Sequence, residues 1–306
     1  MGPAVAMDWA HQGTDWPHRA HSRFVDVASR RWHVQQWPAP QPQAPRVLLL
    51  HGTGASTHSW RGLAPLLARQ AGVLALDLPG HGFSAAAGGD GATLPGMARD
   101  VAALLQQLRF APTLWVGHSA GAAIAVQMAL QAAAEGHAGP AAIVSLNGAL
   151  LPLHGPAWPL FSPLAKLLAA NPLVPQLFAW GAGDLARVRR LVASTGSALD
   201  DEGVALYARL VRDPAHVAGA LAMMANWDLP TLAERLPQLR TPLWLVSGER
   251  DRTLPPSHAQ RVAALLPQAR LQTLPGLGHL AHEEDPARVL QVLRPLLDGG
   301  KAPGAD

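Results

Sequence analysis

The chain has 306 residues, of which 49% are hydrophobic and 15% charged, a balance typical of a globular protein and unlike that of a disordered one. Its formal net charge of +3 comes mainly from arginines, since Lys166 and Lys301 are the only lysines. The arginines are scattered and form no basic stripe, so the sequence does not indicate nucleic-acid binding. Cysteine is absent, which excludes disulfides and thiolate chemistry. Without a secretory leader or a long apolar run, we expect a cytoplasmic protein with no transmembrane segment, and a peripheral position at a membrane stays open.

Strand and helix signals alternate along the chain after an opening hairpin. Residues 22–27 (SRFVDV) and 31–37 (RWHVQQW) predict two antiparallel strands, and a proline-rich connector follows them. Further strands are predicted at 46–52, 73–80, 113–119, 141–148, 242–248 and 269–276, and helices at 94–108, 121–134, before about 266 and before about 297. This alternation predicts an α/β fold with a mostly parallel sheet and helices on both faces.

The stretch 148–228 interrupts the alternation with apolar, proline-broken helical pieces. Between Asn147 and Trp180 the only formal charge is Lys166. We therefore predict a helical cap at 148–228, inserted into a core formed by 1–147 and 229–306. The apolar surface of this cap would pack against the core, line a substrate pocket, or do both. The predicted pocket residues are Trp158, Phe161, Phe178 and Trp180.

Residues 117–121 (GHSAG) fit the G-x-S-x-G motif and lie between a predicted strand and a predicted helix. In this motif the serine sits on a sharp strand-to-helix turn, and side chains in place of the glycines would collide with neighbouring chain. The turn raises the Ser119 hydroxyl above the sheet and points the Ala120 amide at the same space. Ser119 is therefore the predicted nucleophile, and His118 is expected to pack rather than react.

A serine hydroxyl needs a histidine base that is oriented by a carboxylate. In doubly wound hydrolases the acid and then the histidine follow the serine along the chain. Asp251 follows the predicted strand 242–248, and His279 follows the strand 269–276. Both positions lie at carboxyl ends of strands, on the same edge as Ser119, so Asp251 and His279 are the predicted acid and base.

Three other residues compete for these roles. Glu249 lies two positions before Asp251, nearer the strand end, and fits the acid role less naturally. His282 lies about one helical turn beyond the predicted base. Asp77 ends another strand, but it fits better as an anchor for the turn that follows it.

The loop HGTGAST at 51–57 predicts an oxyanion hole, because it would expose backbone amides just beyond a central strand. The Thr53 and Ala120 amides are the expected donors, with Gly54 as the alternative. The loop lacks the lysine of a phosphate-binding loop and the third glycine of the dinucleotide fingerprint. No HExxH motif or ligand cluster is present, so we expect neither a metal nor another cofactor.

These motifs stand in the order of the α/β-hydrolase fold, which the chain resembles over nearly all of its length. A narrower resemblance is to the magnesium-chelatase accessory hydrolase-like family of bacteriochlorophyll biosynthesis (the BchO type), and it lies in residues 15–25, 31–37, 51–68, 161–180 and 207–229. That resemblance implies a role near magnesium insertion into protoporphyrin and the triad Ser119, Asp251 and His279. It also implies Met7 as an alternative start, since the family usually begins with MDW.

Two functions of different classes fit this sequence. The first is a serine hydrolase that cleaves an ester or related acyl bond in a bulky apolar molecule, such as a tetrapyrrole ester or an acyl lipid. The second is a non-hydrolytic accessory protein that binds a porphyrin or contacts the magnesium chelatase. The presence of every predicted catalytic part favours chemistry. A dehalogenase would need aspartate at position 119, whereas peroxidase-like or lyase chemistry on the same triad stays open.

Overall fold

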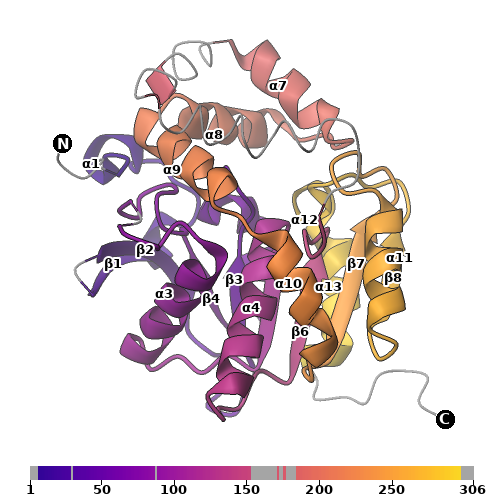
Figure 1. Ribbon diagram of the computed structural model, residues 1–306. Helices are drawn as coiled ribbons and strands as arrows, with labels where there is room; N and C mark the ends of the chain where they lie inside the picture. The colour runs from indigo at the N-terminus through magenta and orange to yellow at the C-terminus, as the bar shows by residue number, and fades with distance from the viewer. Residues whose placement is uncertain are drawn as a thin grey trace.

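A computed structural model of the protein describes residues 6–28, 30–86, 88–152, 171, 175–176 and 184–297, and the statements below concern these residues. An eight-stranded sheet runs through the centre of the molecule (Figure 1). Its strands are β1 Ser22–Val27, β2 Arg30–Trp37, β3 Arg46–Leu50, β4 Gly72–Leu76, β5 Leu114–His118, β6 Ala142–Leu146, β7 Leu243–Gly248 and β8 Arg270–Leu274. Every predicted strand is present.

The strand order, β1-β2-β4-β3-β5-β6-β7-β8, places β3 between β4 and β5. The opening hairpin pairs antiparallel at one edge, and all strands from β4 to β8 in this order run parallel. Because the chain changes direction across the sheet at β3, the loops after β3 and β5 emerge side by side. Leu50 pairs with Gly117 at this point, so the loop at 52–54 and Ser119 are neighbours.

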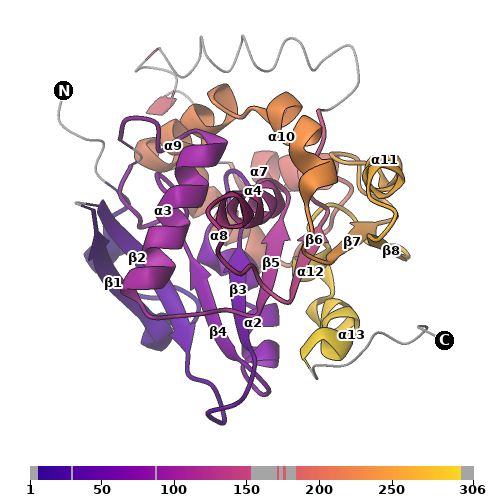
Figure 2. The same ribbon diagram turned by 60° about the horizontal axis from the view of Figure 1, so that its bottom comes forward.

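Helices cover both faces of the sheet (Figures 1 and 2). One face packs against α3, α4, α10 and α11, and the other packs against α2 and α13. The described helices are α1 Trp9–Gln12, α2 Leu63–Leu67, α3 Leu94–Gln107, α4 Ala120–Ala134, α7 Leu185–Ser194, α8 Asp201–Val211, α9 Pro214–Ala225, α10 Leu229–Arg235, α11 Pro256–Leu265, α12 Ala281–Glu284 and α13 Pro286–Leu297. Short 3-10 turns are η1 Arg19–His21, η2 Thr57–Trp60 and η3 Leu236–Gln238.

Strand β3 shows why the sequences of the central strands are continuous apolar runs. Successive side chains of a strand point to opposite faces. Leu48 and Leu50 accordingly join the cluster under α3 and α4, whereas Val47 and Leu49 join the cluster under α2 and α13. A strand buried on both faces needs apolar residues at every position, and these four are fully buried.

Helices α7, α8 and α9, referred to below as the cap helices, lie across one end of the sheet (Figure 1). They fall inside the predicted cap at 148–228, whose division from a core of 1–147 and 229–306 stays a prediction. The predicted pocket residues Trp158, Phe161, Phe178 and Trp180 lie outside the described residues. Among the described helices, none combines the length and the apolar character that crossing a bilayer requires.

Candidate active site

Ser119 occupies a strained turn between β5 and α4, with φ 51° and ψ −116°. A side chain at Gly117 would place its Cβ 2.4 Å from the Ala122 nitrogen, and one at Gly121 would place it 2.1 Å from the Leu50 carbonyl oxygen. Both positions therefore require glycine for steric reasons, as the sequence motif predicts. A positive φ at a non-glycine residue costs about 1–3 kcal/mol, and such strain clusters at functional sites.

His279 and Asp251 form a buried pair close to this turn. The His279 Nδ1 atom lies 2.8 Å from Asp251 Oδ2, and Asn147 Nδ2 donates to the same oxygen at 2.7 Å. The other carboxylate oxygen accepts from the backbone amides of Thr253 and Leu254, each at 2.8 Å. These bonds fix the carboxylate, and they leave His279 Nε2 without a hydrogen-bond partner among the described residues.

The competing residues take other roles. Glu249 is exposed and accepts from the Gly276 amide at 2.8 Å, which secures the turn before His279. His282 is fully buried and bonds Ser59 Oγ at 2.7 Å, and burial lowers its pKa to about 3. Asp77 accepts from the amides of Thr57 and Phe83, as expected of a turn anchor.

His118 packs against the rear of His279. Its Nε2–H donates to the His279 carbonyl oxygen at 3.0 Å, and the two ring centroids are 4.8 Å apart. Burial lowers the pKa of His118 well below its usual range, so the ring is neutral near pH 7. His118 therefore helps to hold the backbone of His279 in place.

The loop at 52–54 lies beside Ser119, and the hydrogen bonds of the described residues leave the amides of Thr53 and Ala120 without acceptors. The His51 Nδ1–H donates to the Gly52 carbonyl at 2.8 Å. In a planar trans peptide the C=O and the following N–H point in opposite directions, so anchoring this carbonyl fixes the direction of the Thr53 N–H. Gly54 has φ 76°, a conformation that glycine adopts without strain.

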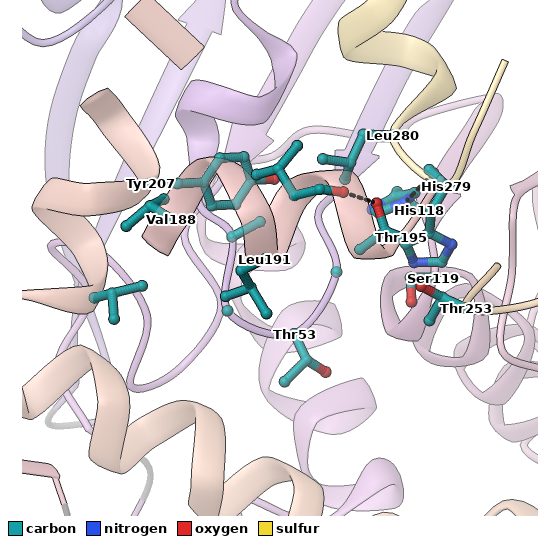
Figure 3. Close-up of a pocket in the computed structure, with 15 residues that line it drawn as sticks. Thr53, His118, Ser119, Val188, Leu191, Thr195, Tyr207, Thr253, His279 and Leu280 are labelled. Carbon is teal, nitrogen blue, oxygen red and sulfur yellow. Dashed lines mark hydrogen bonds between the residues drawn. The ribbon is translucent and has the colours of Figure 1, made fainter. Parts of the chain in front are cut away.

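A cavity of about 330 Å³ joins these parts (Figure 3). Ser119 and His279 lie at one end, and Val188 and Tyr207 lie at the other. No aspartate, glutamate, lysine or arginine is among its described lining residues. The full lining is Gly52, Thr53, Gly54, Ala55, His118, Ser119, Val188, Leu191, Val192, Thr195, Tyr207, Val211, Thr253, His279 and Leu280.

The cap helices supply lining residues that the sequence analysis missed. Val188, Leu191, Val192 and Thr195 follow the 0, 3, 4, 7 spacing of one helical face, which is the signal that could have identified them. Tyr207 lies on α8, where its hydroxyl donates to Glu283 Oε1 at 2.7 Å. The sequence alone does not predict this hydrogen bond, because Tyr207 and Glu283 lie on different helices, 76 positions apart.

Glu283 is the centre of a buried polar cluster beneath this wall. Ser59 Oγ donates to it at 2.8 Å and Arg61 Nη1 at 3.3 Å, in addition to the tyrosine hydroxyl. Burial raises the pKa of Glu283 to about 7, against the opposing effect of these donors. Among the described residues, no group of three or more histidine or acidic side chains is arranged to hold a metal ion.

Comparison with known proteins identifies the family. Residues 45–286, more than half of the chain, match the family of the alpha/beta hydrolase fold. The chain belongs to the family of the alpha/beta hydrolase fold. It is also 38% identical over 270 residues to the magnesium-chelatase 30 kDa subunit of Rhodobacter capsulatus, a match that covers 88% of this chain and 92% of that protein. The two proteins belong to one family, which confirms the resemblance drawn from the sequence.

More distant relatives of this α/β hydrolase include esterases. It is 28% identical over 268 residues to the pimeloyl-[acyl-carrier protein] methyl ester esterase of Methylococcus capsulatus, across 81% of this chain and 94% of that protein. A thermophilic esterase from Thermogutta terrifontis has a similar structure, with a TM-score of 0.69, 22% identity and coverage of 91% and 98%. This structural likeness shows the fold alone.

Proposed function

We propose that the protein is a serine hydrolase in which Ser119, His279 and Asp251 form the catalytic triad. The main observation is that Ser119 and His279 line the same cavity. Asp251 orients the His279 ring through Nδ1, Nε2 has no hydrogen-bond partner among the described residues, and Ser119 lies on a strained strand-to-helix turn. Ser119 Oγ attacks the substrate carbonyl while His279 Nε2 takes its proton and then passes it to the leaving alcohol. Water hydrolyses the resulting acyl-enzyme by the same proton transfers in reverse.

The negative charge that develops on the carbonyl oxygen would be held by the Thr53 and Ala120 amides, with Gly54 as the alternative donor. Ala120 is the first residue of α4, so the positive end of a helix faces the same point. Donors fixed in advance stabilise the transition state without reorganisation, and each typically contributes about 3–4 kcal/mol. Asp251 orients the ring and stabilises the imidazolium that forms.

The cavity supports an ester of a neutral, apolar acyl group as the substrate. Its described wall away from Ser119 consists of aliphatic side chains and the ring of Tyr207, whose hydroxyl is engaged by Glu283. A volume of about 330 Å³ is at the lower end of small-molecule pockets. A charged acyl group would lose its hydration there without finding a partner among the described lining residues.

The name of the Rhodobacter capsulatus relative supports a link to magnesium-tetrapyrrole biosynthesis. Within this proposal the substrate is a methyl ester of a porphyrin or another bulky apolar ester, and the protein works in the cytoplasm or at a membrane surface. The same name favours a second function, in which the protein binds a porphyrin or contacts the magnesium chelatase without hydrolysis.

A fluorophosphonate probe tests the hydrolase directly, since it labels an activated serine without requiring the natural substrate. We expect labelling of the wild type and none of Ser119→Ala. Hexanoyl and adipoyl monoesters of p-nitrophenol form a matched pair. We expect at least about tenfold higher kcat/KM for the neutral hexanoyl ester, because the described lining residues offer no charged partner for the adipoyl carboxylate. An unlabelled, inactive wild type that binds protoporphyrin saturably would support the non-hydrolytic role instead.

A further inference from the structure

Helix α9 presents one face to the loops of the sheet domain. His216, Gly219 and Met223 are spaced by three and four positions, so they lie on the same side of the helix. Each contacts a loop that follows a central strand. His216 reaches Gly54 and Gly82, Gly219 packs on Gly80, and Met223 contacts Thr53. The contacts with Gly54 and Thr53 fall within the candidate oxyanion loop.

His216 is buried and uses both of its ring nitrogens. The Gly82 amide donates to its Nδ1 at 3.0 Å, so the ring proton sits on Nε2, which donates to the Gly54 carbonyl at 3.1 Å. Burial lowers the pKa of His216 to about 4, and the ring therefore keeps this neutral, two-sided arrangement at neutral pH. One side chain thus ties the oxyanion loop to the loop after β4.

Two further contacts hold the helix in place. A Cβ added at Gly219 would lie 1.9 Å from the Gly80 carbonyl oxygen, so the backbones touch only because residue 219 is glycine. Thr53 Oγ1 also lies 3.4 Å from Met223 Sδ. The close approach at Gly219 brings α9 near enough for the neighbouring turn to place His216 against the loop.

We propose that His216 is a positioning residue that holds the oxyanion loop in its active geometry, an inference that rests on the proposed hydrolase function. Carbonyls on both sides of Thr53 are then held by histidine N–H groups. His51 bonds the Gly52 carbonyl and His216 bonds the Gly54 carbonyl. The Thr53 N–H shares a peptide plane with the Gly52 carbonyl, so its rotation breaks the bond to His51. The His216 bond fixes the Gly54–Ala55 peptide, and it thereby restrains the end of the short segment that carries Thr53. The cap thereby contributes to catalysis as well as to the cavity wall.

Two substitutions separate the two bonds of His216. His216→Asn places an amide oxygen where Nδ1 accepts from Gly82 but is too short to reach Gly54. His216→Gln places an amide N–H where Nε2 donates to Gly54 and loses the acceptor for Gly82. We expect H216N to lower kcat on a p-nitrophenyl ester by about 10- to 100-fold with little change in KM, since a displacement of about 1 Å carries that cost. H216Q should lose no more than about threefold, because the loop contact remains.

Val292→Ala serves as the stability control, since Val292 lies on α13 across the sheet and touches neither loop. It should lower Tm and leave kcat unchanged. An H216N variant with wild-type kcat, or H216N and H216Q losing kcat equally, would overturn the positioning role. A wild type that fluorophosphonate does not label contradicts the hydrolase itself, and the positioning role then fails with it.

Gly219→Ala provides a second route that leaves His216 intact. The added methyl group must push α9 away from Gly80, which lengthens the bond between His216 and Gly54. We expect kcat to fall about tenfold and labelling of Ser119 to slow in proportion. Full kcat in a folded G219A variant would show that the loop keeps its geometry without the helix, and would overturn the proposal.

Discussion

Two buried histidine–aspartate pairs among the described residues have the same nitrogen–oxygen distance, one in the candidate site and one bonded to Ser22. In the candidate site, His279 Nδ1 lies 2.8 Å from Asp251 Oδ2. Beside the opening hairpin, His33 Nδ1 lies 2.8 Å from Asp77 Oδ2, and its Nε2 lies 3.0 Å from Ser22 Oγ. Both carboxylates are buried and both also accept backbone amides. The hydrogen bonds of the two histidines to their acids therefore do not distinguish a reactive group from a structural one.

The surroundings of the serine make the difference. Ser22 has an ordinary extended backbone, with φ −79° and ψ 138°, and it does not line the cavity of the candidate site. Ser119 is held at a positive φ at the start of a helix and lines that cavity. His33 uses both ring nitrogens, whereas His279 Nε2 has no hydrogen-bond partner among the described residues. A serine at a strained turn that lines the cavity, rather than the histidine–aspartate contact alone, distinguishes the candidate nucleophile.

The sharpest test compares the two serines. We expect Ser119→Ala to reduce ester hydrolysis by about 10⁶-fold and to abolish fluorophosphonate labelling, because the nucleophile is lost. Ser22→Ala should retain both, since Ser22 faces no substrate cavity here. Mass spectrometry of the labelled wild type locates the modified residue. Label on Ser22 would reverse the comparison.

The two aspartates should separate catalysis from stability. Asp251→Asn should lower kcat by about 10⁴-fold, because His279 loses the carboxylate that selects its tautomer. Asp77→Asn should leave kcat nearly unchanged and lower the free energy of unfolding by about 3 kcal/mol, since it weakens the buried hydrogen bonds that the carboxylate makes with His33 and two backbone amides. Burial alone would raise the pKa of Asp77, but interaction with His33 and a bond from the Phe83 amide lower it overall. Steady-state kinetics measure the loss of kcat, and urea unfolding of the same variants measures the loss of stability.

Acid should destabilise the folded protein through six buried histidines whose pKa values are lowered. Burial lowers the pKa of His216 to about 4 and of His282 to about 3, and it also lowers the pKa values of His51, His58, His81 and His118. Below the unfolded-state pKa of about 6.5 the unfolded chain binds more protons, so stability falls as pH drops from there towards the folded-state values. Thermal melts between pH 7 and 4 should show a steady fall in Tm.

Glu283, near the candidate site, has the opposite effect on the pH dependence of stability from that of the buried histidines. Its folded-state pKa of about 7 exceeds the usual 4.5, so its contribution is complete below pH 4.5 and is lost as pH rises to 7. Replacing it should therefore steepen the loss of Tm on acidification. A Glu283→Gln variant with a shallower acid profile than the wild type would contradict this assignment.

The smallest effect is expected at Glu249. Glu249→Gln keeps an acceptor for the Gly276 amide, and the exposed side chain contacts neither His279 nor Asp251 through a described bond. We expect kcat/KM to change by less than about threefold, as for most exposed substitutions. A loss comparable to that of Asp251→Asn would move the acid role to Glu249. Steady-state kinetics on the same ester decide between them.

Local sequence patterns predicted the fold and the arrangement of the candidate site. The apolar runs of β3 and β5 identified strands buried on both faces, and the glycines at 117 and 121 marked the sharp turn. The contacts of His33 and His216 escaped because they join segments 44 and 134 positions apart. A lone buried histidine carries no periodic signal of its partner. The apolar composition of 148–180 predicted burial for a stretch that lies largely outside the described residues, and it did not indicate that α7 lines the cavity.

The contact between Gly80 and Gly219 has a consequence for how this fold diversifies. A cap taken from another α/β hydrolase could introduce a side chain where the two backbones touch, and it would then no longer seat on the loop after β4. Recombination between relatives would have to keep glycine at both positions to preserve this close contact. The cap helices and the loop after β4 are therefore coupled through this contact, although they are separated in the sequence.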